Sequence, residues 1–289
     1  MFDQVEAFYQ PSSVPEALRL LEKGRGRARV LAGGTGVVVE GGASVRYLID
    51  LGRAGLSYIR RRDSACLIGA ATILAELEES TAIRALAGGL LSRAAAACGS
   101  VQNRNRATVG GNLAQGSPAA DMAPPLLVLD AVVTVADARG RHKMAIGDYL
   151  DRVHRKALPN SLLVEIAIPE PPRGNRCGWS FQKFGRTEVD IAIVNVAAGL
   201  QLDARGKVKW ARLALGAASP FAFRACGVEE RLAGHELDHS LLAAACEQVP
   251  REVRPIDDVR ASAEFRRELS RVLAGRALED CAIQAGWTL

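Results

Sequence analysis

Aromatic residues are scarce in this chain, at 5% of 289 residues. The formal net charge is +5, but the arginines are spread along the chain and do not gather in one segment. Nucleic-acid-binding surfaces usually combine a concentrated basic patch with stacking aromatic rings. We therefore expect no nucleic-acid partner.

The cysteines do not form a ligand pattern. Six of them stand far apart, at positions 66, 98, 177, 226, 246 and 281, and no CxxC occurs. This spacing is unlike that of zinc or iron–sulfur ligand sets. A disulfide framework is also untypical of so large and apolar a chain. We expect reduced cysteines and no metal in this chain.

Long apolar runs are missing as well. The longest, residues 191–200 and 241–246, fall far short of the roughly 20 residues that cross a bilayer. Acidic Asp3 and Glu6 stand where a secretory signal carries basic residues. We expect a cytoplasmic protein that does not span a membrane.

The first half of the chain mixes short helix and strand patterns. Ser13 and Glu16 form a capping box ahead of apolar residues at helical spacing, which predicts a helix that ends near Lys23. Thr72 is expected to cap a second helix that runs to Leu77. The other expected elements are strands 28–32 and 45–50, a hairpin of 58–62 with 65–68, helices 82–87, 89–98 and 119–129, and a hairpin of 131–136 with 142–146.

The second half is organised differently. Residues 169–175 include three prolines and a glycine, which is typical of a linker or a tight loop. Beyond it the sequence predicts strands 178–184, 190–202 and 208–216, then helices 228–232, 240–248 and 261–278. Strands followed by a block of helices indicate a separate α+β domain.

Two glycine-rich segments carry the main functional signal. The first, Gly33-Gly34-Thr35-Gly36, directly follows an expected strand, and the second contains Gly110-Gly111. Glycine allows the backbone to approach a ligand closely, and consecutive amides form a concavity that binds anions. Thr108 and Ser117 could add hydroxyl donors for phosphate, and the Asp121 carboxylate suits sugar hydroxyls.

Each segment alone is more typical of a plain tight turn, because short glycine motifs recur often. Neither matches the G-x-G-x-x-G of a Rossmann fold, and the GK[ST] of a phosphate-binding P-loop is absent from the sequence. A nucleotide site built from these segments must be of another kind.

The histidines offer little chemistry. The four histidines stand apart from any serine or cysteine that could serve as a nucleophile. His235 and His239 have the spacing of two metal ligands on a helix, but Gly234 indicates that a helix ends there, so a solvated turn is the preferred interpretation. Residues 60–62, all arginine, are interpreted as a solvated hairpin tip.

Four motifs together resemble a known family. They are LAGGT at 31–35, VQNRNRATVGGN at 101–112, SPAAD at 117–121 and PIDDVRASAEFR at 255–266. In this order and spacing they resemble the FAD-binding (medium) subunits of the molybdenum hydroxylases, of the carbon monoxide dehydrogenase and xanthine dehydrogenase type. The resemblance covers residues 5–278, nearly the whole chain.

The resemblance implies an α+β fold in two parts. Residues 1–170 would form an FAD-binding domain of the vanillyl-alcohol-oxidase (PCMH) type, with subdomains of about 1–55 and 56–170 on either side of FAD. Residues 176–289 would form a C-terminal α+β domain of the carbon monoxide dehydrogenase flavoprotein type.

It also implies the residues around the cofactor. Those expected to hold the FAD pyrophosphate and its neighbourhood are Leu31, Ala32, Gly33, Gly34, Thr35, Gly36, Val37, Val38, Thr108, Val109, Gly110, Gly111 and Asn112. Asp121 would contact the sugar, Leu163 and Lys183 would border the flavin, and Ile191 would be an apolar contact. Lys183 as a surface strand residue and Ile191 as ordinary core are the alternatives.

One position departs from the family pattern. Many relatives carry aspartate after AGGT, where this chain has Gly36, so a side-chain hydrogen bond of the family is absent here. We still expect FAD to be retained.

The function implied is electron transfer, with no catalytic acid, base or nucleophile in this chain. FAD would receive electrons from [2Fe-2S] clusters in a small partner subunit, which drain the molybdenum cofactor of a large subunit, and would pass them to NAD, a quinone or another acceptor. A dimer of such heterotrimers is expected. Reductases of the 4-hydroxybenzoyl-CoA type carry a further cluster on a cysteine-bearing insertion, which is absent here. A stand-alone flavin oxidoreductase and an FAD-free scaffold subunit are the alternatives.

Overall fold

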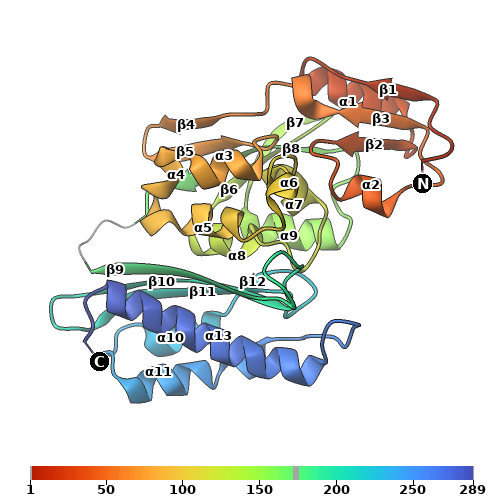
Figure 1. Cartoon of the computed structure of the whole chain (residues 1–289). Helices are drawn as coiled ribbons and strands as arrows, with labels where there is room; N and C mark the ends of the chain where they lie inside the picture. Colours follow the sequence, from red (N-terminus) through yellow and green to blue (C-terminus); the bar gives the residue numbers. More distant parts are fainter. Residues whose placement is uncertain (1, 172–175, 289) are drawn as a thin grey trace. The chain divides into compact units, whose positions relative to one another are not determined.

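The computed structural model describes residues 2–171 and 176–288 (Figure 1). Its contacts divide the chain into two compact units. Unit 1 comprises residues 2–77, 100–116 and 131–170, and unit 2 comprises residues 78–99, 117–130 and the described residues from 171 onward. The domains expected from the sequence are consecutive stretches. In the structure, residues 78–99 and 117–130 of the expected first domain belong to unit 2. Residues 172–175 of the predicted linker lie outside the described residues.

A small parallel sheet opens unit 1. Its strands are β1 (Ala7–Tyr9), β3 (Tyr47–Asp50) and β2 (Ala28–Leu31), in that spatial order. Helix α1 (Val14–Lys23) follows β1, with Ser13 at its N-cap. The predicted capping box is only half correct, because the Glu16 carboxylate accepts from the Ser12 N–H at 2.8 Å and does not reach back to Ser13.

The larger sheet of unit 1 is antiparallel. Its strands are, in spatial order, β4 (Ile59–Arg62), β5 (Ala65–Gly69), β8 (Leu162–Pro169), β6 (Val132–Asp137) and β7 (Gly140–Ala145). Both predicted hairpins, β4–β5 and β6–β7, are confirmed. The two sheets share a core in which Val14, Ala17 and Ile49 pack with Leu162 and Val164 of β8.

Short helices complete unit 1. They are α2 (Val37–Glu40), the 3-10 turn η1 (Leu51–Arg53), α3 (Leu74–Glu79), α6 (Val101–Arg104), α7 (Val109–Ala114) and α9 (Ile146–His154). Thr72 does not cap a helix as predicted, because its hydroxyl bonds the backbone of Tyr58 instead. Helix α9 was not predicted, although its buried residues Ile146, Tyr149 and Leu150 have helical spacing.

Unit 2 is built on a four-stranded antiparallel sheet. Its strands are, in spatial order, β12 (Phe223–Arg224), β11 (Val208–Gly216), β10 (Val194–Leu202) and β9 (Cys177–Phe184). Every residue of β10 is buried, which requires cover on both faces of the sheet. The strand predicted for residues 190–202 begins four residues later in the structure, at Val194.

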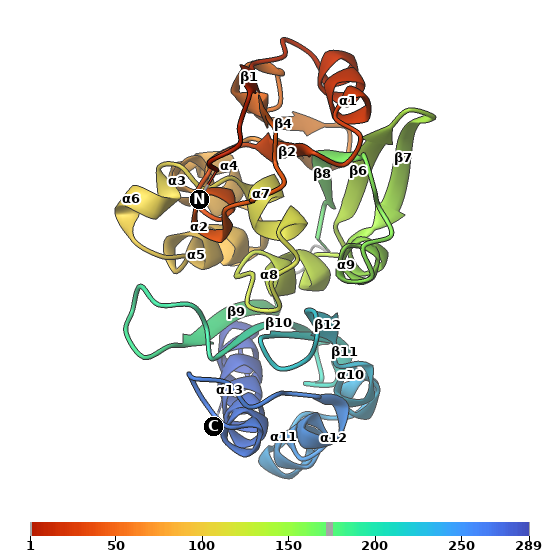
Figure 2. The same cartoon turned by 90° about the vertical axis from the view of Figure 1, so that its right-hand side faces the viewer.

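Helices cover both faces of this sheet within unit 2. On one face lie α5 (Leu90–Ala96), which packs on β9, and α8 (Ala123–Val128), which packs on β10 and β11 (Figure 1). On the other face lie α10 (Cys226–Leu232), α11 (His239–Cys246), α12 (Val249–Glu252) and α13 (Ala263–Gln284) (Figure 2). The remaining elements of unit 2 are α4 (Thr81–Arg84) and the 3-10 turn η2 (Ala87–Gly89).

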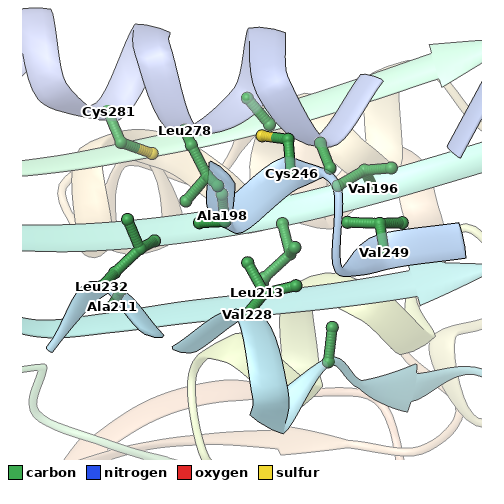
Figure 3. Close-up of a cluster of buried hydrophobic side chains, with 14 of the residues drawn as sticks. Val196, Ala198, Ala211, Leu213, Val228, Leu232, Cys246, Val249, Leu278 and Cys281 are labelled. Atoms are coloured by element: carbon green, nitrogen blue, oxygen red, sulfur yellow. The ribbon is translucent and has the colours of Figure 1, made fainter. Parts of the chain in front are cut away.

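The core of unit 2 explains why the predicted helices form. Side chains from β10, β11, α10 and α13, among them Val196, Leu213, Val228 and Leu278, meet in one apolar cluster (Figure 3).

Helix α8 begins at Ala123, later than the predicted residue 119. Its two prolines occupy the first turn, where backbone amides have no acceptor within the helix.

Candidate functional site

The first glycine segment leaves a row of backbone donors without partners. It links β2 to α2, and Gly34 has a φ of +77°, which favours glycine. The amides of residues 33–37 donate no hydrogen bond to any residue that the structure describes. Buried or ligand-facing amides normally find an acceptor. This segment is therefore ready to bind an anion or another acceptor.

A cavity of about 430 Å³ lies beside these amides. The residues that line it are Phe8, Leu31, Ala32, Gly33, Gly34, Thr35, Val38, Val39, Asp50 and Arg106. The Asp50 carboxylate already accepts from Gln10 Nε2 and from the Gly52 N–H, both at 3.0 Å. Phe8, Val38 and Val39 remain exposed, at 54%, 62% and 86%. The cavity thus combines amide donors with apolar walls, as small-molecule sites do.

The second glycine segment starts a helix, and its amides are bonded within the protein. Thr108 is the N-cap of α7, and its hydroxyl accepts from the Gly111 N–H at 3.0 Å. The Val109 N–H donates to Thr72 O and the Gly110 N–H to Ala70 O. These amides are engaged inside the protein.

Gly110 serves close packing instead. A Cβ at this position would lie 2.5 Å from Ala70 O, so no other residue fits without moving the backbone. The second segment therefore shapes the surroundings of the first and supplies few free donors.

The two glycine segments lie together in the structure. A Cβ at Gly33 would lie 1.9 Å from Arg106 O and 2.9 Å from Ala107 Cα, so the two segments are in backbone contact. Side chains add a second link, because Gln115 Nε2 donates to Glu40 Oε1 at 2.9 Å. Glu40 also accepts from Arg29. Helices α2 and α7 are thereby tied together within unit 1 (Figure 1).

Gln115 also accounts for the departure at Gly36. A Cβ on Gly36 would lie 2.6 Å from Gln115 Oε1, so the glutamine fills the space that a side chain at residue 36 would need. Gly36 and Gln115 are complementary in shape. Gln115 was not predicted as a site residue, because its contact with Gly36 depends on the fold.

A buried polar cluster in unit 2 joins two more of the predicted residues. Asp121 and Lys183 form an ion pair of 2.7 Å, with side chains 5% and 7% exposed. Lys183 Nζ also donates to Ala97 O, and Asn195 Nδ2 donates to the second oxygen of Asp121. Burial raises the pKa of Asp121, and the Lys183 ammonium opposes that rise. Lys183 is thus not the surface residue of the alternative interpretation.

Two predicted residues stand outside these groups. Leu163 lies in β8 of unit 1, pairs with Val135 and is 8% exposed. Ile191 lies outside the strands of unit 2 and is 54% exposed, so it is not ordinary core. The Ile193 N–H, two residues later, closes the β9–β10 turn on Phe184 O.

The structure adds three observations on other expected features. In the described ranges, no group of three or more His, Cys, Asp or Glu could hold a metal ion. His239 begins α11, and its ring packs on Trp287 with centroids 4.8 Å apart. No helix of residues 2–171 or 176–288 is long and apolar enough to cross a membrane.

Comparison with known proteins identifies the family of the chain. Residues 2–171 match the family described as the FAD binding domain in molybdopterin dehydrogenase. The chain belongs to this family. Residues 179–281 match the CO dehydrogenase flavoprotein C-terminal domain. The resemblance found in the sequence is therefore confirmed, and so are the expected FAD cofactor and the oxidoreductase class.

Whole-length relatives support the assignment. Subunit alpha of the 6-hydroxypseudooxynicotine dehydrogenase complex of Paenarthrobacter nicotinovorans is 34% identical, over 96% of this chain and 93% of its own. The xanthine dehydrogenase FAD-binding subunit of Escherichia coli O157:H7 is 30% identical over 100% of both. A chain of carbon monoxide dehydrogenase from Hydrogenophaga pseudoflava superposes with a TM-score of 0.89 at 27% identity, covering 98% of this chain and 99% of that chain. The expected fold class is confirmed.

Proposed function

We propose that this chain is the FAD-carrying electron-transfer subunit of a molybdenum hydroxylase complex. A small partner subunit would carry iron–sulfur clusters and a large one the molybdenum cofactor, in a dimer of heterotrimers. Electrons would leave through this chain to an external acceptor such as NAD or a quinone. The relatives support this, since one is named as a subunit of a dehydrogenase complex and another as an FAD-binding subunit.

The observation that carries the proposal is the row of unpartnered amides of residues 33–37, of which Gly33, Gly34 and Thr35 line the cavity. A diphosphate has oxygen acceptors for such a row. The residues present therefore fit FAD, because Gly33 and Gly110 allow the backbone segments around these amides to pack closely. When bound, FAD supplies reversible one- and two-electron transfer.

The chain's own residues have distinct parts in this proposal. The amides of residues 33–37 donate to phosphate oxygens, and residues 108–112 hold the neighbouring wall in place through internal bonds. The Asp121–Lys183 pair fixes Asn195 and the carbonyl of Ala97 inside unit 2. Contacts of Asp121, Leu163, Lys183 and Ile191 with the sugar or flavin remain predictions.

The test uses the tagged chain purified from its source under mild conditions. We expect a yellow complex with two further chains, one with molybdenum and one with iron and acid-labile sulfide. After chemical reduction, NAD or a quinone should re-oxidise both the flavin and the iron–sulfur clusters, and the visible absorbance of both should return.

The matched control is the same complex carrying Thr35→Trp, which fills the cavity beside the amides. It should assemble without FAD and keep its iron–sulfur clusters reduced when the acceptor is added. A chain that purifies alone and turns over a substrate, or an FAD-free complex that is re-oxidised as fast as the parent, would contradict the proposal.

A further inference from the structure

Arg106 is the only cation among the described residues that line the cavity. Its side chain is exposed and has no hydrogen-bond or ion-pair partner among the residues that the structure describes. The other arginine close to the loop, Arg29, is already paired with Glu40 at 2.6 Å. The guanidinium of Arg106 is therefore available to a ligand.

The backbone of Arg106 is fixed beside the first glycine segment. Its carbonyl oxygen lies where a Cβ on Gly33 would clash, and its N–H donates to Asn103 O at 3.0 Å. The side chain therefore starts from a fixed point next to the unpartnered amides. Only its own rotamers have to be ordered when a ligand arrives.

We propose that Arg106 forms a charge-assisted contact with the diphosphate of the bound dinucleotide. This inference rests on the proposed function, which places FAD against residues 33–37. Amides supply dipoles but no net charge, and Asp50 adds a negative charge to the same cavity. A diphosphate therefore needs a cation there, and the planar guanidinium suits two phosphate oxygens at once.

The contact predicts a binding preference that depends on phosphate. Adenosine and ADP share the base and the sugar but differ in the diphosphate. Arg106 should therefore favour ADP over adenosine and contribute to the affinity for FAD. A residue that only supports the loop would affect all these ligands alike.

The experiment uses the full chain freed of FAD, with flavin fluorescence to measure FAD affinity and competition to measure ADP and adenosine. Arg106→Gln should weaken FAD and ADP by about ten-fold or more, since hydrogen bonds to charged groups are the strong ones. Adenosine should compete as well as with the parent. Arg106→Lys should recover part of the loss, because it keeps the charge but not the fork.

Arg139→Gln is the matched control, because Arg139 lies at the β6–β7 turn of the same unit and the net charge changes equally. It should bind all three ligands like the parent. Unchanged FAD affinity in Arg106→Gln would overturn the inference alone, and so would an equal loss for ADP and adenosine. A parent chain that binds no FAD would overturn the proposed function, and this inference with it.

Discussion

The two glycine pairs look alike in the sequence but differ in the hydrogen bonds that their amides make in the structure. Gly33-Gly34 belongs to a segment whose amides have no partner among the described residues and which borders a cavity. Gly110-Gly111 donates both of its amides inside the protein, to Ala70 O and to Thr108 Oγ1. The first pair leaves its amides open beside a cavity, whereas the second pair uses its amides in internal packing.

The position of the neighbouring threonine separates the two cases. Thr108 stands two residues before its glycine pair, which makes it the N-cap of α7 and gives the Gly111 N–H an acceptor. Thr35 stands directly after its pair and caps nothing that the structure describes. A glycine pair that follows a capping hydroxyl is thus expected to use its amides internally.

The largest effect should come from Gly110→Val. The Cβ of the valine would lie 2.5 Å from Ala70 O, a backbone atom that can move only if the backbone itself shifts. We expect a loss of about 4 kcal/mol or more in the free energy of unfolding, with or without FAD. Denaturant unfolding of the FAD-free chain measures it.

Gly111→Ala is the control for that variant. A Cβ there meets only the Thr108 hydroxyl, at 2.9 Å, and alanine favours the helix by about 1 kcal/mol over glycine. Stability close to that of the parent is expected. Equal losses in both variants would show that Gly110 has no special packing role.

Much of the fold could be predicted from the sequence because its signals are local. The hairpins β4–β5 and β6–β7 follow from polar turn residues between short strand patterns. The start of β10 could not, because the apolar residues 191–193 continue the strand pattern in the sequence, whereas Ile191 is exposed and Ile193 still closes the turn on Phe184 O. Features that depend on contacts between distant residues cannot be predicted from such local signals.

The candidate site was predictable in part. The motifs placed Gly33 and Gly110 near one another, and the structure brings their segments together. The motifs could not reveal that the Gly110 amide is already bonded to Ala70 O. They also could not reveal Gln115 or Asn195, whose partners lie 75 and 74 residues away in the chain. Such pairs depend on topology.

The second largest effect should come from Thr35→Trp, which tests the ligand-binding half of the comparison. Because Thr35 lines the cavity, we expect the indole to fill it and the FAD-free chain to unfold as the parent does. FAD at about a hundred-fold excess over its Kd stabilises the parent by about 2.7 kcal/mol through mass action. The variant should lose that gain. Thermal unfolding with and without FAD measures both quantities, and a retained gain would contradict the assignment.

A smaller effect is expected at the link between the two segments. Gly36→Ala should cost about 1 kcal/mol, because the new Cβ displaces the Gln115 amide from its hydrogen bond with Glu40. The φ of Gly36 is −92°, so alanine adds no backbone strain. In Gln115→Ala the space is open, and adding Gly36→Ala should then cost almost nothing. A coupling energy below about 0.3 kcal/mol in this double-mutant cycle would show that the two residues do not compete for space.

An effect of similar size is expected for Thr108→Val, and this variant separates the roles of the two segments. Valine keeps the shape but removes the hydroxyl that accepts from the Gly111 N–H, so unfolding should become easier by about 1 kcal/mol. If the hydroxyl serves only as a cap, FAD affinity measured by fluorescence should match that of the parent. A variant with parent stability and about ten-fold weaker FAD binding would mean that Thr108 donates to the ligand, and that both glycine segments bind phosphate directly.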